Sequence, residues 1–419
     1  MGSSVSRSLR GAIALAACAV FVASGCAGSL PGGNDSAIVT FAATRASGGD
    51  LGRLVERYNT TRPGSPVRYV ALATEADQQR RAMVQDLQAR TGRYDVLYVD
   101  AVWTAEFAAR GWLEPLEAQR FAGPEILDAA AATGRWNGRL YAAPFATGTG
   151  LLFYRSDLVE KPPTTWQELL EACAIAKREA MDCYAGQYMR YEGLTVAVVE
   201  AIASAGGRVI GADGTVTVNS PQARRGLRFL VEARERGHIP HAALTYNEDL
   251  TRLAFQRGEL LFMRNWAFAY PLMNAPGEES VVQGRFDVAA LPGPGGPGTG
   301  TLGGNNLGLS AYSDHKAEAL RFIEFLQSEA VMREWLTATS TPMARTELFT
   351  DPEILRHAPY LAPMRAGLER TRPRPVTPRY NDVTNAVQQH AYAAMSGEAT
   401  VEEAISGMHA ELNRVVQGR

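Results

Sequence analysis

Aromatic rings and planar hydrogen-bonding side chains occur together where predicted strands and helices meet loops. Asp100 follows the apolar run 96–99, and Trp103 comes three residues later. Carboxylate and guanidinium groups form charge-assisted hydrogen bonds worth roughly 1.5 to 3 kcal/mol each, and aromatic faces cover flat patches of C–H groups. A neutral saccharide presents both hydroxyl groups and such patches, so this combination favours saccharide binding. Further residues of these types at loop positions are Tyr191, Glu192, Trp266, Arg374 and Tyr380.

Several of these residues also have a purely structural interpretation. Trp103 lies four residues before Phe107, which is the spacing of one helix face, and such a stripe often belongs to a core. Asp100 could cap the helix that follows it, and Arg374 could pair with any surface acid. Trp266 follows a polar break after a strand, which favours contact with a ligand. Core packing and ligand contact therefore both stay open for Trp103.

The sequence lacks the common motifs of nucleotide-binding and catalytic sites. Two GxGxxG matches within 293–303 neither follow a predicted strand nor open a helix, so no dinucleotide site is expected. His238 and His241 have a spacing that a metal could use, but the proline between them favours a loop, and no metal or cofactor is predicted. Asp100 and Glu192 could serve as acid and base of a secreted carbohydrate-active hydrolase or lyase. This alternative stays open because its test is a distance between carboxyl groups.

The first 36 residues have the pattern of an exported and tethered protein. Arginines precede the apolar run 11–23, which at 13 residues is too short to span a bilayer, so 1–25 is predicted to be a signal peptide. The run ends in ASGC, which resembles a bacterial lipobox and predicts lipidation of Cys26, although Ala23 stands where leucine is commonest. Secretion with Cys26 as a bystander is the alternative. The small and polar residues of 26–36 predict a flexible tether.

The composition is that of a globular protein with more than one domain. Of 419 residues, 46% are hydrophobic and 21% are charged, and the net charge is −2. This balance argues against nucleic acid as a partner, which would favour a basic surface. No stretch after the signal reaches 18 apolar residues, so no transmembrane helix is predicted. Cys173 and Cys183 could form a disulfide outside the cytoplasm, and two unpaired thiols are the alternative.

Predicted strands and helices alternate in the first part of the chain. Strands are predicted at 37–43, 67–72 and 94–99, and helices at 50–59, from Thr74, and from about 101 to the residue before Gly111. Thr74 and Asp77 have the spacing of a capping box. The alternation predicts a mostly parallel sheet with helices on both faces, in which ligands bind beyond the carboxyl ends of the strands. Asp100 stands at such an end.

A second α/β set follows. Its strands are predicted at 150–155 and 259–263, and its helices at 165–179, 193–207, 221–236 and 247–257. Thr165 and Glu168 have the spacing of a capping box. The run 290–306 is too rich in Pro and Gly for a core element, and a strand at 307–312 and further helices complete the chain.

The predicted fold class is α/β, with two lobes joined by more than one crossing strand and able to close on a ligand like a hinge. The expected bounds are 37–145 with 303–342 for the N-terminal lobe, 146–292 with 343–419 for the C-terminal lobe, and 293–302 for a crossover near the hinge.

Five segments stand in the order YDVLYVDAVWTAEFAARGWLEPL, NGRLYAAPFATGTGLLFYRSDLV, RYEGLTVAVVEAIASAGG, FQRGELLFMRNW and TLGGNNLGLS. Over nearly all of the mature chain they resemble the substrate-binding lipoproteins of sugar ABC transporters, solute-binding protein family 1. Within this family the chain looks most like the trehalose and maltose binders and the mycobacterial trehalose-recycling protein, of which DAVWTAEFAARGW is typical. The resemblance implies a periplasmic-binding-protein-like fold with an interlobe cleft, a disaccharide in that cleft, and its delivery unaltered to permease subunits driven by a cytoplasmic ATPase. It implies a binding protein and not an enzyme, acting as a monomer anchored by lipid at the outer face of the cell membrane.

The resemblance also implies which residues contact the sugar. Carried over by position, they are Asp100, Tyr191, Glu192, Gly193, Trp266, Gly303, Gly304, Asn305, Arg374 and Tyr380. Trp103 completes the predicted set, together with Arg45 and Gln78 from the first two strand-end loops. One position departs from the family: Gly148 stands where relatives carry Asn or Asp. A missing partner for a buried sugar hydroxyl would cost about 1 to 3 kcal/mol unless Thr147, Thr149 or water replaces it, so a ligand other than trehalose stays open.

Overall fold

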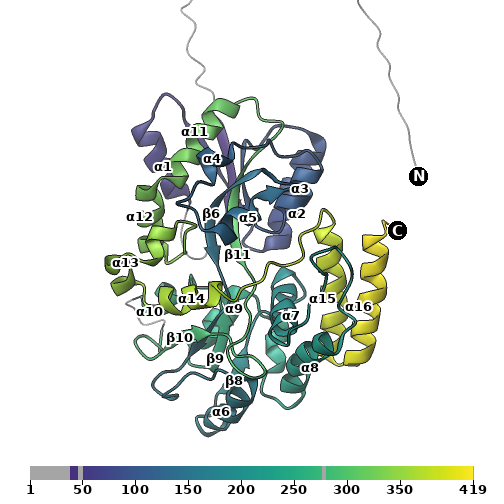
Figure 1. Ribbon diagram of the computed structural model, residues 1–419. Helices are drawn as coiled ribbons and strands as arrows, with labels where there is room; N and C mark the ends of the chain where they lie inside the picture. The colour runs from purple at the N-terminus through teal and green to yellow at the C-terminus, as the bar shows by residue number, and fades with distance from the viewer. Residues whose placement is uncertain (1–37, 46–50, 276–279, 419) are drawn as a thin grey trace, which may run out of the picture. The chain divides into compact units, whose positions relative to one another are not determined.

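A five-stranded sheet forms the first lobe, in the order β2-β1-β3-β11-β6. Figure 1 labels two of its strands, β6 and β11. The computed structural model describes residues 38–45, 51–275 and 280–418, so the predicted signal peptide, the tether and Cys26 lie outside the described residues. The strands of this sheet are β1 (Val39–Thr44), β2 (Val67–Leu72), β3 (Val96–Asp100), β6 (Ala142–Gly148) and β11 (Gly303–Leu309). β1 pairs in parallel with β2 and β3, as the strand–helix alternation predicts, whereas β11 runs antiparallel to both of its neighbours.

Helices cover both faces of the first sheet because successive strand residues point to opposite sides. Phe41 packs with residues of α1 and α11 in one buried cluster, and its neighbour Ala42 packs with residues of α2 and α3 in another. The helices of this lobe are α1 (Gly52–Thr61), α2 (Ala76–Ala89), α3 (Thr104–Ala109), α4 (Ala118–Phe121), α5 (Asp128–Thr133), α11 (Lys316–Gln327) and α12 (Glu329–Thr339). A small hairpin of β4 (Arg135–Trp136) and β5 (Arg139–Leu140) lies between α5 and β6 in sequence.

The second lobe is built on a four-stranded sheet in the order β10-β7-β9-β8. Its strands are β7 (Leu151–Tyr154), β8 (Asp182–Ala185), β9 (Leu260–Asn265) and β10 (Asp287–Ala290). Its helices are α6 (Trp166–Arg178), α7 (Glu192–Ser204), α8 (Pro221–Glu235), η1 (His241–Thr245), α9 (Glu248–Gln256) and α10 (Ala269–Asn274). α7 is buried along nearly its whole length, which is why most of its residues are apolar; its two acids, Glu192 and Glu200, are buried as well.

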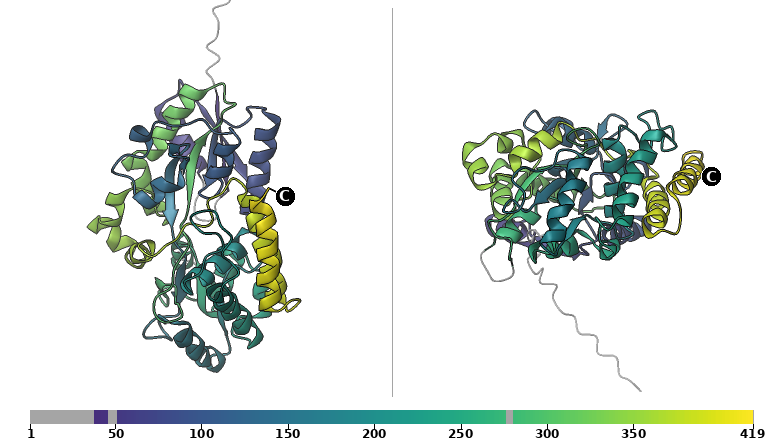
Figure 2. Two further views of the ribbon diagram at one scale, coloured as in Figure 1. Left: turned by 45° about the vertical axis from the view of Figure 1, so that its right-hand side comes forward. Right: turned by 90° about the horizontal axis from the view of Figure 1, so that it is seen from below.

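The C-terminal segment returns to the second lobe. Its elements are η2 (Thr346–Phe349), α13 (Pro352–His357), α14 (Leu361–Leu368), α15 (Tyr380–Ser396) and α16 (Val401–Val416). α14 packs against β7 and β10, while α15 and α16 lie side by side along α7 and α8 (Figures 1 and 2). The chain thus passes between the lobes three times, after β6, before β11 and after α12, as the prediction of more than one crossing requires. Within the described ranges, no helix combines the length and hydrophobicity needed to cross a membrane.

Of the two predicted capping boxes, one is confirmed and one is wrong. At α6 the Thr165 side chain accepts a hydrogen bond from the Glu168 amide, and the Glu168 carboxylate accepts one from the Thr165 amide. At α2 the helix begins later than expected, with Glu75 at the N-cap and no capping hydrogen bond from a side chain. Thr74 therefore lies one residue before the cap, and its carbonyl oxygen accepts a hydrogen bond from the Gln79 side chain.

The predicted strand at 307–312 begins earlier, at Gly303, so the interpretation of 303–306 as unsuited to a core element is wrong. These residues fit a strand because β11 is inserted between β3 and β6 and is paired on both sides. Gly304 has a φ of 129°, and a Cβ there would lie 2.2 Å from the carbonyl oxygen of Ala146. The glycines thus permit a close approach of two backbones, which the composition did not indicate.

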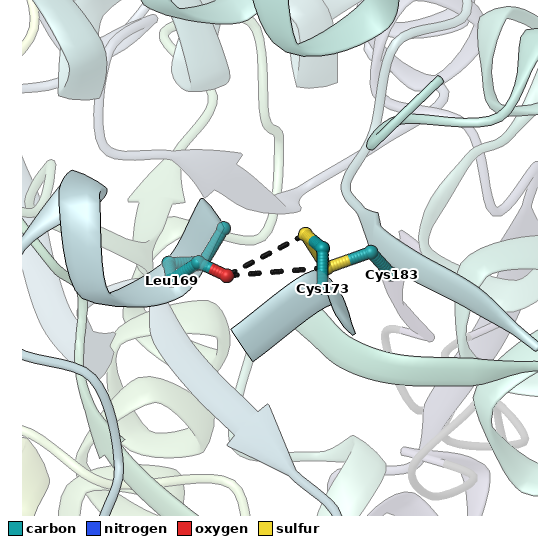
Figure 3. The surroundings of a disulfide bond; sticks show 3 residues. All are labelled: Leu169, Cys173 and Cys183. Carbon is teal, nitrogen blue, oxygen red and sulfur yellow. Dashed lines mark hydrogen bonds between the residues drawn. A yellow bond between two sulfur atoms is a disulfide. The ribbon is translucent and has the colours of Figure 1, made fainter. Parts of the chain in front are cut away.

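Cys173 and Cys183 form a disulfide in the structure, one of the two alternatives that the sequence left open (Figure 3). Cys173 is on α6 and Cys183 is on β8, and both sulfur atoms lie near the carbonyl oxygen of Leu169, at 3.5 and 4.0 Å. The bond ties α6 to the edge strand of the second sheet. Neither cysteine lines the cavity that most of the predicted ligand-binding residues share.

Candidate ligand-binding site

A cavity of about 270 Å³ is lined by residues of both lobes. This volume lies slightly below the usual range of small-molecule sites, which begins at roughly 300 Å³. The predicted residues that line it are Asp100, Trp103, Tyr191, Glu192, Gly193, Trp266, Gly303, Gly304, Asn305 and Arg374. The first lobe supplies the carboxyl ends of β3 and β6 and the start of β11, and the second lobe supplies the starts of α7 and α9 and the loop after β9.

Arg374 joins the two lobes inside the cavity wall. It lies between α14 and α15, and its side chain is only 2% exposed. One guanidinium nitrogen, Nη2, donates a hydrogen bond to Asp100 Oδ1 at 2.9 Å, and the other, Nη1, donates one to Glu192 Oε1 at 2.6 Å. Although burial favours the neutral form, the carboxylates of Asp100 and Glu192 raise the pKa of Arg374. A carboxylate at the end of β3 is thereby linked to one at the start of α7.

Glu192 is held by three donors. Besides Arg374, the Tyr380 hydroxyl donates to Oε1 at 2.5 Å and the Thr384 hydroxyl donates to Oε2 at 2.7 Å. Burial raises the pKa of Glu192, and the charge of Arg374 opposes this shift. The hydrogen bonds from Tyr380 and Thr384 fix the Glu192 carboxylate in place. The fixed carboxylate in turn positions the guanidinium group of Arg374. Tyr380 is buried behind Glu192 and is not among the residues that line the cavity.

Trp266 presents an aromatic ring to the cavity from the loop after β9. The guanidinium carbon of Arg264 lies 4.1 Å from the ring centroid, and Arg264 is itself held by Glu200 through hydrogen bonds of 2.7 and 2.9 Å. This buried support fixes the ring plane. On β11, a Cβ at Gly303 would approach the ring to 2.8 Å, so only glycine allows the strand and the indole to lie this close.

Trp103 and Tyr191 line the cavity and also serve the protein core. Trp103 is 3% exposed and stacks on Phe107 with ring centroids 6.3 Å apart, as the core interpretation predicts. Trp103 also lines the cavity, as the ligand interpretation predicts. The hydroxyl of Tyr191 donates a hydrogen bond to Glu248 Oε2 at 2.5 Å. Burial raises the pKa of Glu248, which lies at the start of α9.

Arg45 and Gln78 are not brought to the cavity wall. Arg45 is exposed, and its backbone amide donates to the carbonyl oxygen of Leu72. Gln78 is exposed and donates from its side chain to Glu75 Oε2 at 2.7 Å. Its neighbour Gln79 is buried and lines the cavity instead, because one residue along a helix turns the side chain by about 100°.

A family model described as bacterial extracellular solute-binding protein matches residues 42–333. The chain belongs to this family. This extracellular solute-binding protein is 30% identical over 372 residues to a probable ABC transporter-binding protein of Deinococcus radiodurans, covering 84% of this chain and 87% of that one. It is 24% identical over 338 residues to the sn-glycerol-3-phosphate-binding periplasmic protein UgpB of Escherichia coli (strain K12), covering 72% and 74%. The structure of maltose-bound MalE3 of T. maritima is similar with a TM-score of 0.85 and 32% identity, over 90% of this chain and 99% of that chain.

Family membership settles the fold class and the enzyme alternative. The solute-binding protein has the α/β two-lobed fold of periplasmic binding proteins, as predicted. Members of this family bind solutes and are not enzymes, so the hydrolase or lyase alternative that used Asp100 and Glu192 is wrong. The hydrogen bonds agree with this outcome because both carboxylates are paired with Arg374.

Sequence reasoning missed several polar residues of the cavity in this solute-binding protein. They are Thr44, Thr74, Glu75, Gln79, Asn247, Glu248, Asp249 and Thr341. Glu75 is the N-cap of α2, and Gln79 lies in its first turn. The Glu75 side chain makes no capping hydrogen bond, and this polar helix start is the signal that could have drawn attention to both residues. Asn247 is the N-cap of α9, and that role gives no hint of a cavity in the sequence. Thr147 and Thr149, named beside the Gly148 departure, also line the cavity; the buried Thr149 hydroxyl has no hydrogen-bond partner among the described residues.

Proposed function

We propose that this protein is the substrate-binding component of an ABC importer for sugars and that it captures an uncharged disaccharide of the trehalose or maltose kind in the interlobe cavity. The observation that carries the proposal is the juxtaposition of the Trp266 ring with Asp100 and Arg374 across one cavity lined by both lobes. Rings cover C–H faces of a sugar, and the charged groups meet its hydroxyls. The relation to a maltose-bound protein at 32% identity supports the same ligand class.

The charges of the cavity favour an uncharged ligand over a phosphorylated one. The lining residues include five acids, Glu75, Asp100, Glu192, Glu248 and Asp249. Arg374 is the one basic residue among the described residues that line the cavity, and Asp100 and Glu192 already engage it. A phosphate group would enter a region of excess negative charge and find no unpaired cation there. Glycerol 3-phosphate, which the name of UgpB assigns to that relative, is therefore a poor candidate here.

Capture follows from the placement of the site between lobes. A sugar that contacts Asp100 on the first lobe and Trp266 on the second binds the closed form better than the open form, and this difference in affinity drives closure. Permease subunits and their ATPase are the partners that would receive the sugar unaltered. Lipidation at Cys26 would hold the protein at the outer face of the membrane, and this part of the proposal rests on the sequence pattern alone.

Calorimetry of Trp266→Ala with trehalose and maltose tests the proposal. We expect at least one of the two sugars to bind the wild type and the variant to bind it at least tenfold more weakly, which corresponds to about 1.4 kcal/mol. Trp136→Ala is the matched control, because Trp136 is also half-buried but lies on the β4–β5 hairpin outside the cavity lining. A wild-type protein that binds neither sugar, or equal affinities in wild type and Trp266→Ala, would contradict the proposal.

A further inference from the structure

The glycines that line the cavity differ in what surrounds them. At Gly193 a Cβ would lie 2.2 Å from the Tyr191 hydroxyl oxygen, at Gly303 it would lie 2.8 Å from the Trp266 ring, and at Gly304 it would lie 2.2 Å from a backbone oxygen. These three glycines are needed because the protein itself fills the space beside them. At Gly148 a Cβ would meet no heavy atom within 4 Å. Its backbone also lies outside the left-handed region, so the backbone does not require glycine there.

The open space beside Gly148 is next to the aromatic part of the site. Gly148 is the last residue of β6 and pairs directly with Gly303 of β11. The Trp266 ring lies against Gly303, so the space opens onto the same stretch of cavity wall as the indole. A ligand ring stacked on Trp266 would extend toward Gly148. Protein interiors rarely leave such gaps unless a ligand or water occupies them.

We infer that part of the bound saccharide enters the space beside Gly148 and that the missing side chain at this position sets the size of the sugar that the cavity accepts. The inference rests on the proposed function, since it concerns the same cavity. It identifies Gly148 as a specificity-determining residue: a side chain at this position takes the volume that a sugar ring edge or ring substituent occupies in the wild type. Gly148 itself offers the sugar only its backbone, so its effect is on the volume of the cavity.

Gly148→Ala and Gly148→Val test the inference, with calorimetric titration of maltose and trehalose as the probes. We expect Gly148→Ala to weaken binding about tenfold and Gly148→Val about a hundredfold, because overpacking a filled space typically costs on the order of 1 to 3 kcal/mol. Gly64→Ala is the matched control. A Cβ at Gly64 also meets nothing within 4 Å, its backbone is not left-handed, and it lies outside the cavity lining. Thermal unfolding of each variant shows whether it is folded, and if Gly148→Val does not fold, Gly148→Ala decides.

The outcomes separate this inference from the proposed function. If the wild type binds a sugar and both Gly148 variants bind it as tightly or more tightly, the space is not occupied by ligand and the inference is overturned, while the proposed function stands. If the wild type binds neither sugar, the proposed function fails and the inference fails with it. Weaker binding in the Gly148 variants with unchanged binding in Gly64→Ala supports the inference.

Discussion

Replacing Arg374 by methionine should destabilise the folded protein strongly, because two carboxylates from different lobes share its guanidinium group. The side chains of Arg374 and Glu192 are 2% and 5% exposed, and that of Asp100 is 18% exposed. Arg374→Met removes hydrogen bonds of 2.6 and 2.9 Å and leaves both acids without a counter-charge. Two charge-assisted hydrogen bonds at roughly 1.5 to 3 kcal/mol each sum to about 3 to 6 kcal/mol, and breaking a buried ion pair typically costs about 3 to 5 kcal/mol. We therefore expect a loss of about 3 to 5 kcal/mol in the free energy of unfolding.

Urea unfolding at neutral pH, followed by tryptophan fluorescence, measures this loss. Arg236→Met is the control: Arg236, at the C-cap of α8, pairs with Glu232 on the surface, and 63% and 45% of the two side chains are exposed. Its removal should cost less than about 1 kcal/mol. The double variant Arg374→Met with Glu192→Gln should recover at least about 1 kcal/mol, because the uncompensated charge at Glu192 is gone. If Arg374→Met costs no more than Arg236→Met, the reasoning that a buried guanidinium joins the two lobes is refuted.

Two further predictions concern pH and the disulfide. Burial raises the pKa of the Glu248 carboxyl group above its ordinary value, so the folded protein binds the carboxyl proton more tightly than the unfolded chain does. This tighter binding stabilises the folded protein fully at pH values below the ordinary pKa. The stabilisation is lost as the pH rises through the raised pKa. The wild type should therefore lose stability relative to Glu248→Gln as the pH rises above the ordinary glutamate pKa, measured by urea unfolding at each pH, and parallel pH profiles would contradict this. Replacing both Cys173 and Cys183 by serine should lower the free energy of unfolding by about 2 to 3 kcal/mol, since the bond closes a loop with a sequence separation of 10, whereas sugar affinity should stay unchanged. A change in affinity without a change in stability would be inconsistent with a bracing role.

Interactions between near neighbours were predictable from the sequence in part, since one of the two predicted capping boxes formed and the one at Thr74 did not. The capping box of Thr165 and Glu168 involves residues three apart, so the pattern and the hydrogen bonds coincide. The alternation of strands and helices likewise indicated the parallel arrangement of β1, β2 and β3, because a parallel pair needs a crossover of the length that a helix supplies. The carboxylate at the end of β3 followed from the same reasoning, since ligand sites in such sheets lie beyond the carboxyl ends of the strands.

The sequence by itself thus determined the residue types expected at the site, the order of helices and strands, and the resemblance to the solute-binding family. The resemblance named many of the distant residues that line the cavity, but only the tertiary structure decided how these residues contact one another and which neighbours join them. Arg374 meets Asp100 and Glu192 across 274 and 182 residues of chain, Gln79 lines the cavity where its neighbour Gln78 does not, and the space beside Gly148 exists because no other element fills it. Periodicity and capping depend on residues within a few positions of each other, whereas the partners of a side chain in a cavity are set by how helices and sheets pack, which no local pattern records.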